Sequence, residues 1–142
     1  MKDEADPGTA SLLDLASSEP DGELAIRVCP MPADLNSAGD VFGGYVMAQM
    51  DIAGSLMAVE IANGRVATVA VDAMVFVAPV KSGDVLCIYN TLRRRGRTSV
   101  TVQVEAWVRR KVIGERIKVT EADFTYVHLD EDGRPKALPD AA

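Results

Sequence analysis

Histidine and cysteine are scarce in this chain of 142 residues. It has one histidine, His128, and two cysteines, Cys29 and Cys87, which form neither a CxxC pair nor a Cys/His cluster. We therefore expect no zinc site and assign no metal ligand. Both cysteines stand in apolar surroundings, so we expect two buried free thiols in a reducing cytosol.

The sequence also lacks the motifs of several enzyme classes. It has no Walker loop and no GxGxxG, which disfavours nucleotide hydrolysis and dinucleotide redox chemistry. It has no Gly-x-Ser-x-Gly elbow, and any Ser-His or Cys-His pair would need His128, near the C-terminal end. With a formal net charge of -6, the chain is a poor candidate for binding nucleic acid.

No targeting or membrane signal is visible. The first residues are acidic and polar rather than basic and then apolar, so we expect no signal peptide and a cytoplasmic protein. The long apolar stretch over residues 43–62 contains Gln49, Asp51 and Glu60 and lacks basic anchors on its N-terminal side. We interpret it as a buried helix of a soluble domain and expect no membrane partner.

The length predicts one domain. Residues 1–21 are rich in Asp, Glu, Ser, Gly and Pro and are predicted to form a flexible arm, whereas residues 22–139 form the domain. Periodicity and turn residues predict a helix over 43–62, closed by Asn63-Gly64, and five strands, over 23–29, 67–77, 85–91, 100–108 and 116–128. This order is typical of an α+β fold in which a curved antiparallel sheet wraps around one long helix.

Five strands leave part of such a helix uncovered. Because the helix is apolar on most sides, self-association is the simplest way to hide the remainder from water. Gly44 and Gly54 would permit close contacts along the helix.

Asp51 is the most informative residue, because it lies in the middle of this apolar helix. A helix that is apolar nearly all round is buried, so we expect Asp51 to lie away from bulk water, at a cost of several kcal/mol unless it is paired. A structural ion pair with Arg65 or another cation is one interpretation, and a wet seam at the helix edge is a second. The functional interpretation is a general base or a nucleophile in a pocket wall.

Gly43 and Gly44 begin the same helix. Two glycines at a helix start let a ligand approach the backbone, where free N–H groups and the helix dipole favour an oxyanion or a polarised carbonyl. Tight packing is the alternative role for the pair. Asp51 lies two helical turns further along, about 10.5 Å of rise, on the same face as the helix start.

Basic residues are concentrated in one part of this acidic chain. Seven of the fifteen lie within residues 93–111, namely Arg93, Arg94, Arg95, Arg97, Arg109, Arg110 and Lys111. Such a patch near hairpin ends suits a phosphate-bearing ligand such as a nucleotide tail. The alternative is a solvated hairpin whose charges protect a sheet edge.

Several blocks of the sequence resemble the YciA-type acyl-CoA thioesterases of the hotdog fold. The resemblance begins with Met31–Gly44 and Met47–Asp51 and covers roughly residues 22–139. It continues through Gly64-Arg65-Val66, Phe76–Val80, Gly83-Asp84-Val85, Gly96–Ser99, Glu105–Val108 and Pro135–Pro139. It implies a helix enclosed by a curved sheet, a dimer with one continuous sheet and active sites shared across the interface, and assembly as a trimer of dimers.

The resemblance also implies a set of site residues. The helix carboxylate of the family corresponds to Asp51, and the implied catalytic set is completed by Asn36 and Asp40 in the loop and by the backbone donors of Gly43 and Gly44. Related hotdog thioesterases often carry a histidine before the two glycines, where this chain has Phe42, as the YciA type does. If the ligand is coenzyme A, the basic run predicts that its phosphates lie near the arginine-rich hairpins, and the residues predicted to bind it are Arg93, Arg97, Ser99, Arg109 and Arg110.

The implied reaction is hydrolysis of acyl-CoA thioesters to free acid and CoA, with Asp51 either activating water or attacking the carbonyl. Coenzyme A is then part of the substrate and product, and no separate cofactor is expected. An acyl-thioester dehydratase would need a histidine beside a carboxylate, and the only histidine lies at a strand end. A non-catalytic acyl-CoA-binding protein is the other alternative, and thiol release from acyl-CoAs distinguishes it from an esterase.

Overall fold

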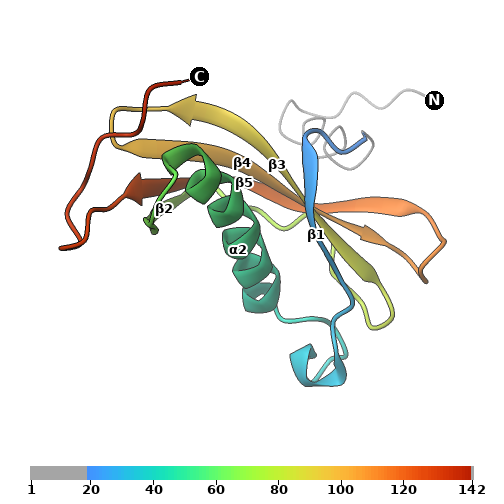
Figure 1. Cartoon of the computed structure of the whole chain (residues 1–142). Helices are drawn as coiled ribbons and strands as arrows, with labels where there is room; N and C mark the ends of the chain where they lie inside the picture. Colours follow the sequence, from blue (N-terminus) through green and yellow to red (C-terminus); the bar gives the residue numbers. More distant parts are fainter. Residues whose placement is uncertain (1–18, 142) are drawn as a thin grey trace.

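The computed structural model describes residues 19–141 and forms one helix packed on one face of a curved sheet (Figure 1). The predicted arm over residues 1–21 lies almost wholly outside the described residues. The elements are β1 (Glu23–Val28), the 3-10 turn η1 (Pro32–Asp34), α2 (Gly43–Ala62), β2 (Val66–Asp72), β3 (Val85–Arg95), β4 (Ser99–Arg109) and β5 (Arg116–His128).

All strand pairs are antiparallel, and the sheet has the order β1-β3-β4-β5-β2. The three central strands form a meander, whereas β1 and β2 flank it and lie on either side of α2 in the sequence. The predicted hairpin turn is present, because the Gly96 N–H donates to the Ser99 carbonyl at 2.8 Å. The predicted α+β arrangement of one helix on an antiparallel sheet is therefore confirmed.

The helix has the predicted bounds. It ends at Ala62 because Asn63 adopts a left-handed backbone with a φ of 52°, and the Asn63 N–H donates to the Val59 carbonyl. Asparagine tolerates this conformation better than most residues with a side chain, so it serves as the helix stop.

Two strand predictions are wrong at their ends. The strand expected over 67–77 stops at Asp72, because Ala73 has a φ of 47° and turns the chain out of the extended conformation. The following segment still reaches β5, since the Val77 N–H donates to the Val119 carbonyl at 2.8 Å. The strand expected over 85–91 extends to Arg95, because its pairing with β4 continues to the hairpin turn.

The core lies between α2 and the sheet. Its fully buried members include Val46, Met50, Ala53 and Ala58 on the helix, and their partners on the strands are Leu86, Ile88, Val100, Val102, Val104, Val108, Val119, Phe124 and Tyr126. Cys87 is buried as expected, but Cys29 is exposed, so the expectation of two buried thiols is wrong for Cys29. Cys29 follows the last residue of β1 and therefore lies outside the packed part of that strand.

The helix and the sheet approach each other closely at Gly54. A Cβ atom on Gly54 would lie 2.3 Å from the Tyr126 hydroxyl oxygen, so the ring occupies the space that any other side chain would need. The Tyr126 hydroxyl donates to the Asp51 carbonyl at 2.9 Å, and the Asn90 Nδ2 donates to the Ala53 carbonyl at 2.8 Å. Burial, followed by the nearby Asp51 carboxylate, raises the pKa of Tyr126 well above its usual range, so the hydroxyl remains a donor.

One face of the helix remains uncovered within the single chain, as five strands predict. Met47, Ile52, Leu56 and Val59 are exposed on α2. Further exposed apolar side chains follow on and after β2, namely Val69, Val71, Val75 and Phe76. Among the described residues, no helix is long and apolar enough to cross a membrane.

Gly54→Ala should lower the free energy of unfolding by about 1–3 kcal/mol, because its methyl group would overlap the Tyr126 hydroxyl. Tyr126→Phe removes that oxygen, so part of the cost should disappear in the double variant. Urea unfolding of the four proteins checks this. Strict additivity of the two single changes would contradict the proposed contact.

Candidate active site

The loop before the helix is held by Asn36. The side-chain oxygen of Asn36 accepts hydrogen bonds from the backbone N–H groups of Ala38 at 2.9 Å and Asp40 at 3.1 Å. The backbone N–H of Asn36 donates to the Asp40 carbonyl at 2.7 Å. This local bonding is the usual turn chemistry of asparagine. It fixes the path of the chain from Asn36 to the start of α2.

A groove of about 400 Å³ opens at the start of α2. It is lined by Asn36, Asp40, Val41, Gly43, Val46, Phe76, Val77, Ala78, Pro79 and Val80. The structure thus brings together three of the predicted catalytic residues, from the loop and the helix start, with an apolar wall from the segment between β2 and β3. Gly44 is the next residue of the helix after Gly43. A Cβ atom on Gly44 would have no neighbour within 4 Å among the described residues.

Asp40 at the groove is paired with Lys81. The Lys81 ammonium lies 2.8 Å from Asp40 Oδ1, and the two side chains are 47% and 32% exposed. Asp40 and Lys81 also form an isolated antiparallel backbone bridge, which joins the loop to the segment between β2 and β3. Asp40 therefore already has a cation partner at the edge of the groove.

The helix start is electrostatically open. Phe42 is the N-cap and makes no side-chain capping hydrogen bond, and the first turn contains no acidic residue. The N–H groups of Gly43 and Gly44 therefore have no carboxylate of their own helix to neutralise them, and the positive end of the helix dipole faces the groove.

Asp51 is half-buried in the single chain, not fully removed from solvent as predicted, because the helix face beside it is uncovered. Its Oδ1 accepts the Thr68 hydroxyl at 2.7 Å. Within residues 19–141 no cation lies at ion-pair distance from Asp51, and Arg65 instead donates to the Asp130 carbonyl. A structural ion pair is therefore not the role of this aspartate in the single chain.

Asp51 does not line the groove. It lies two helical turns beyond Gly44, about 10.5 Å along the axis, and its side chain is directed to Thr68 on β2. One chain therefore does not bring its own helix start and its own Asp51 to the same small group.

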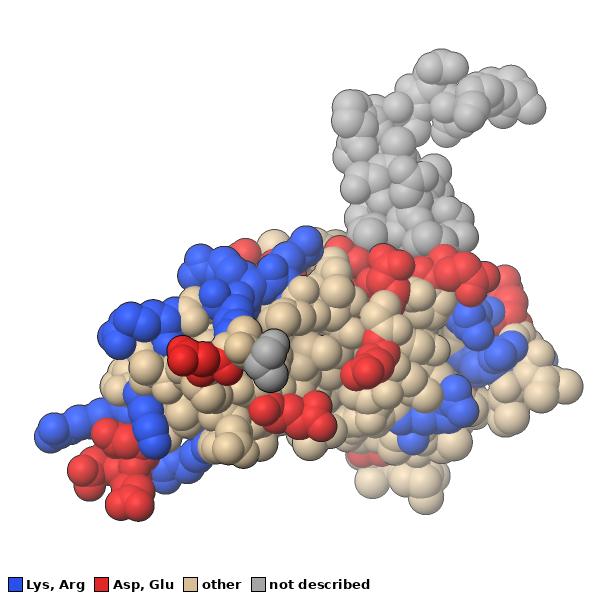
Figure 2. All heavy atoms as spheres, turned by 45° about the horizontal axis from the view of Figure 1, so that its top comes forward, with Lys and Arg blue, Asp and Glu red and all other residues tan. Residues whose placement is uncertain are grey.

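The basic run predicted as one patch forms two separate groups. Antiparallel β4 spans Ser99–Arg109, about 30 Å of extended chain, so the residues before it and after it lie at opposite ends of the sheet. Figure 2 shows Lys and Arg side chains at both ends of the molecule, with acidic and uncharged surface between them. At the β3–β4 end Arg97 is exposed, and Arg93 lies 3.5 Å from Asp123.

At the opposite end, Arg110 is directed into the protein rather than to a ligand. Its Nε lies 3.1 Å from Oδ1 of the buried Asp84, and its Nη2 donates to the carbonyl of Pro79, which lines the groove. Asp84 Oδ2 accepts the backbone N–H of Lys81. Arg110 thus supports the groove wall from behind, whereas Arg109 lines a cleft on the other face of the sheet.

Two contacts of Asp51 could not be predicted from the sequence. Thr68 was one polar residue of an alternating strand, and its proximity to Asp51 follows from the docking of β2 on the helix. Tyr126 was part of the last strand, and only the notch at Gly54 brings its hydroxyl to the helix. His128, the single histidine of the chain, is buried beside the Ala137 carbonyl, 3.1 Å from its Nδ1, and does not line the groove.

The fold is that of a hotdog-type thioesterase. The thioesterase superfamily matches residues 38–113. "Acyl-CoA thioester hydrolase YciA" of Salmonella typhimurium is 51% identical over 123 residues, covering 84% of this chain and 92% of the relative. The relative of that name in Escherichia coli K12 is 50% identical, covering 84% and 93%.

Solved structures agree with the sequence relatives. The hexameric thioesterase y2039 from Yersinia pestis has a TM-score of 0.83 and 51% identity, covering 87% of this chain and all of that one. HI0827, a hexameric broad specificity acyl-coenzyme A thioesterase, has a TM-score of 0.82 and 45% identity, covering 87% and 85%. The chain belongs to the thioesterase superfamily and is a homologue of the YciA acyl-CoA thioester hydrolases.

Proposed function

We propose that this chain hydrolyses acyl-CoA thioesters to the free acid and CoA, at a site formed by the groove at the start of α2 together with Asp51. The observation that carries the proposal is the groove itself. The groove lies between the uncapped N–H groups at the helix start and an apolar wall formed by Phe76–Val80. The relatives with 50% and 51% sequence identity are named acyl-CoA thioester hydrolases.

The helix start suits the carbonyl of a thioester. Attack by water turns the carbonyl oxygen into an oxyanion, and the N–H groups of Gly43 and Gly44 would donate to it while the helix dipole lowers its energy. The apolar wall would hold the acyl chain. The water proton passes to a base, the carbon–sulfur bond breaks, and CoA leaves as the thiolate that then takes up a proton.

Asp51 is the base, or the nucleophile, in this proposal. Its Oδ1 is held by the Thr68 hydroxyl, which fixes the carboxylate without neutralising it. Because Asp51 lies two turns from the Gly44 of its own chain, we place it against the helix start of a second copy. The site is then completed only in an oligomer, and the exposed apolar face of α2 is the surface that a second copy would cover.

The reaction needs water and the thioester and no separate cofactor in this proposal. Asn36 and Asp40 shape the groove on the loop side, and the Asp40–Lys81 pair fixes its edge. Arg93, Arg97 and Ser99 at the β3–β4 end are proposed to bind the phosphates of CoA. Arg110 supports the groove wall instead, because its guanidinium is engaged by Asp84 and Pro79.

Asp51→Asn should lower kcat by about two to four orders of magnitude while keeping fold and assembly, because the amide cannot take up a proton or attack the carbonyl. Thiol release from a panel of acyl-CoAs measures the effect. The charge-matched control is Asp132→Asn in the exposed turn after β5, which should keep normal turnover. A folded Asp51→Asn protein with near-normal turnover would refute the assignment.

The protein should behave as a homo-oligomer in solution, a dimer at least and a trimer of dimers in the proposed assembly. Light scattering should then give a mass several times the 15.2 kDa of the chain. The hexameric relatives and the uncovered helix face both support this expectation. A monomer at micromolar concentration would reject the shared site.

Arg97→Ala should raise KM for acyl-CoA and change kcat less, the pattern of lost uniform binding. Arg97 follows the hairpin Gly96 and has an exposed side chain, so it is free to reach a phosphate. A short acyl-pantetheine thioester has no nucleotide and serves as the matched substrate. Equal weakening of both substrates would show that Arg97 does not contact phosphate.

A further inference from the structure

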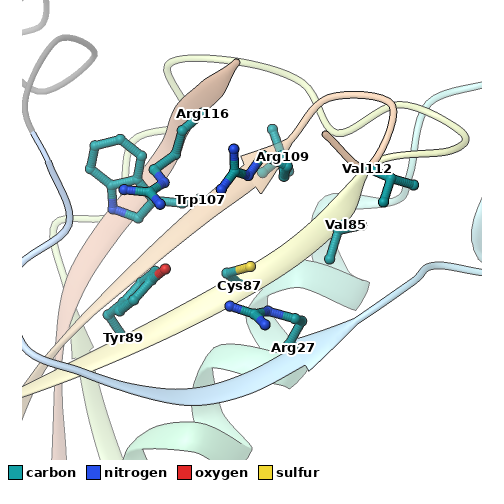
Figure 3. Close-up of a pocket in the computed structure, with 9 residues that line it drawn as sticks. Arg27, Val85, Cys87, Tyr89, Trp107, Arg109, Val112 and Arg116 are labelled. Atoms are coloured by element: carbon teal, nitrogen blue, oxygen red, sulfur yellow. The ribbon is translucent and has the colours of Figure 1, made fainter. Parts of the chain in front are cut away.

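The outer face of the sheet, opposite α2, contains a cleft of about 220 Å³ that the proposed hydrolysis does not use (Figure 3). Three arginines from three different strands line it, Arg27 from β1, Arg109 from β4 and Arg116 from β5. Figure 3 shows the three arginine side chains around Cys87, with Tyr89 and Trp107 at one side of the group. In a chain of net charge -6, this is a local concentration of positive charge.

Sheet register places the three arginines along the same cleft. Arg27 pairs with Cys87, which in turn pairs with Trp107, and Arg109 pairs directly with Arg116. Like charges directly opposite each other on neighbouring strands repel and destabilise the sheet. The Arg109–Arg116 pair therefore needs an explanation.

A second like-charge pair in the same β4–β5 ladder provides the comparison. Glu105 pairs with Glu121, and the buried Lys118 ammonium lies 3.9 Å from Glu105 and contacts Glu121. That pair is therefore bridged within the protein by one cation, whose side chain is only 5% exposed and which offsets one of the two negative charges.

The arginine pair has no comparable internal partner among residues 19–141. Arg116 contacts Glu19 at 2.9 Å, but the Glu19 side chain is 88% exposed, and such pairs contribute little. Arg109 donates to the Gly114 carbonyl at 3.4 Å, and neither Arg109 nor Arg27 forms an ion pair with a described carboxylate. Among the described residues, no buried carboxylate therefore does for these arginines what Lys118 does for the two glutamates.

We propose that this cleft binds the phosphate group of a small molecule between Arg109, Arg116 and Arg27. Guanidinium groups match phosphate oxygens with paired hydrogen bonds, and a dianion neutralises two facing arginines at once. The cleft is smaller than the roughly 300–1,000 Å³ of sites that enclose a drug-sized ligand. It therefore suits a phosphate with a small substituent, or one phosphate of a larger molecule.

Thermal unfolding of the full chain with sodium pyrophosphate tests the proposal, in low-salt buffer free of phosphate and with sodium chloride at equal ionic strength as the reference. Pyrophosphate should raise the Tm of the wild type by about 3–5 °C at saturation. Arg109→Gln and Arg116→Gln should lose most of this rise. Arg134→Gln, an exposed arginine in the turn after β5, is the matched control and should keep it.

A second measurement separates anion binding from a merely structural role. Without any anion, Arg109→Gln should melt at the same temperature as the wild type or above it, because the facing charges are removed. Arg109→Lys keeps the charge but not the planar fork, and should weaken pyrophosphate binding about tenfold. If Arg109→Gln does not fold, Arg116→Gln and Arg109→Lys carry the comparison.

Calorimetric titration with pyrophosphate, CoA and dephospho-CoA identifies the source of the phosphate. Loss of CoA binding in Arg109→Gln would assign the cleft to a phosphate of CoA, whereas loss of pyrophosphate binding alone would assign it to another phosphate compound. These binding readouts do not depend on hydrolysis, so failure of the proposed activity leaves them intact. An equal pyrophosphate response in wild type and Arg109→Gln would overturn the proposal, as would a response to polyglutamate in place of pyrophosphate.

Discussion

The position of the helix on the sheet depends on close packing at Gly54, where the Tyr126 hydroxyl occupies the space that a side chain would need. The hydroxyl donates to the Asp51 carbonyl, and burial keeps it protonated. A ring on the sheet that fits only where the helix lacks a side chain fixes both the rotation and the axial position of α2. That placement directs the Asp51 carboxylate toward Thr68 on β2, where the proposed chemistry requires a fixed but charged base.

A chain of ion pairs and hydrogen bonds stabilises the groove at the start of the helix. Asp84 holds Arg110 and the Lys81 backbone, Arg110 holds the Pro79 carbonyl, and Lys81 pairs with Asp40. The wall and the mouth of the groove are thus tied to the strands behind them through charged side chains. The wall formed by Phe76–Val80 can present apolar side chains to the groove because Asp84 and Arg110 support it from behind.

Sequence reasoning reached the elements whose signals are local. Asn63-Gly64 ended the helix, and the alternating valines defined β4. The catalytic role of the glycine pair and Asp51 stays a prediction. The prediction of a single basic patch was wrong. The arginines before and after β4 are close in the sequence, but they lie at opposite ends of that strand. The partner of Asp51 and the end of β2 at Ala73 depended on register and on one backbone angle, which no periodicity encodes.

The strand order has a consequence for how this chain folds. The meander β3-β4-β5 closes through short turns, whereas Glu23 pairs with Asn90 and Val66 with His128, each across nearly half the chain. Closing those long loops costs chain entropy before the contacts form, so the meander should assemble first and the two flanking strands should dock with the helix later. Asp51 is carried by the late segment. We therefore expect the carboxylate to reach its place beside Thr68 only when folding is nearly complete, after the three-stranded meander has formed.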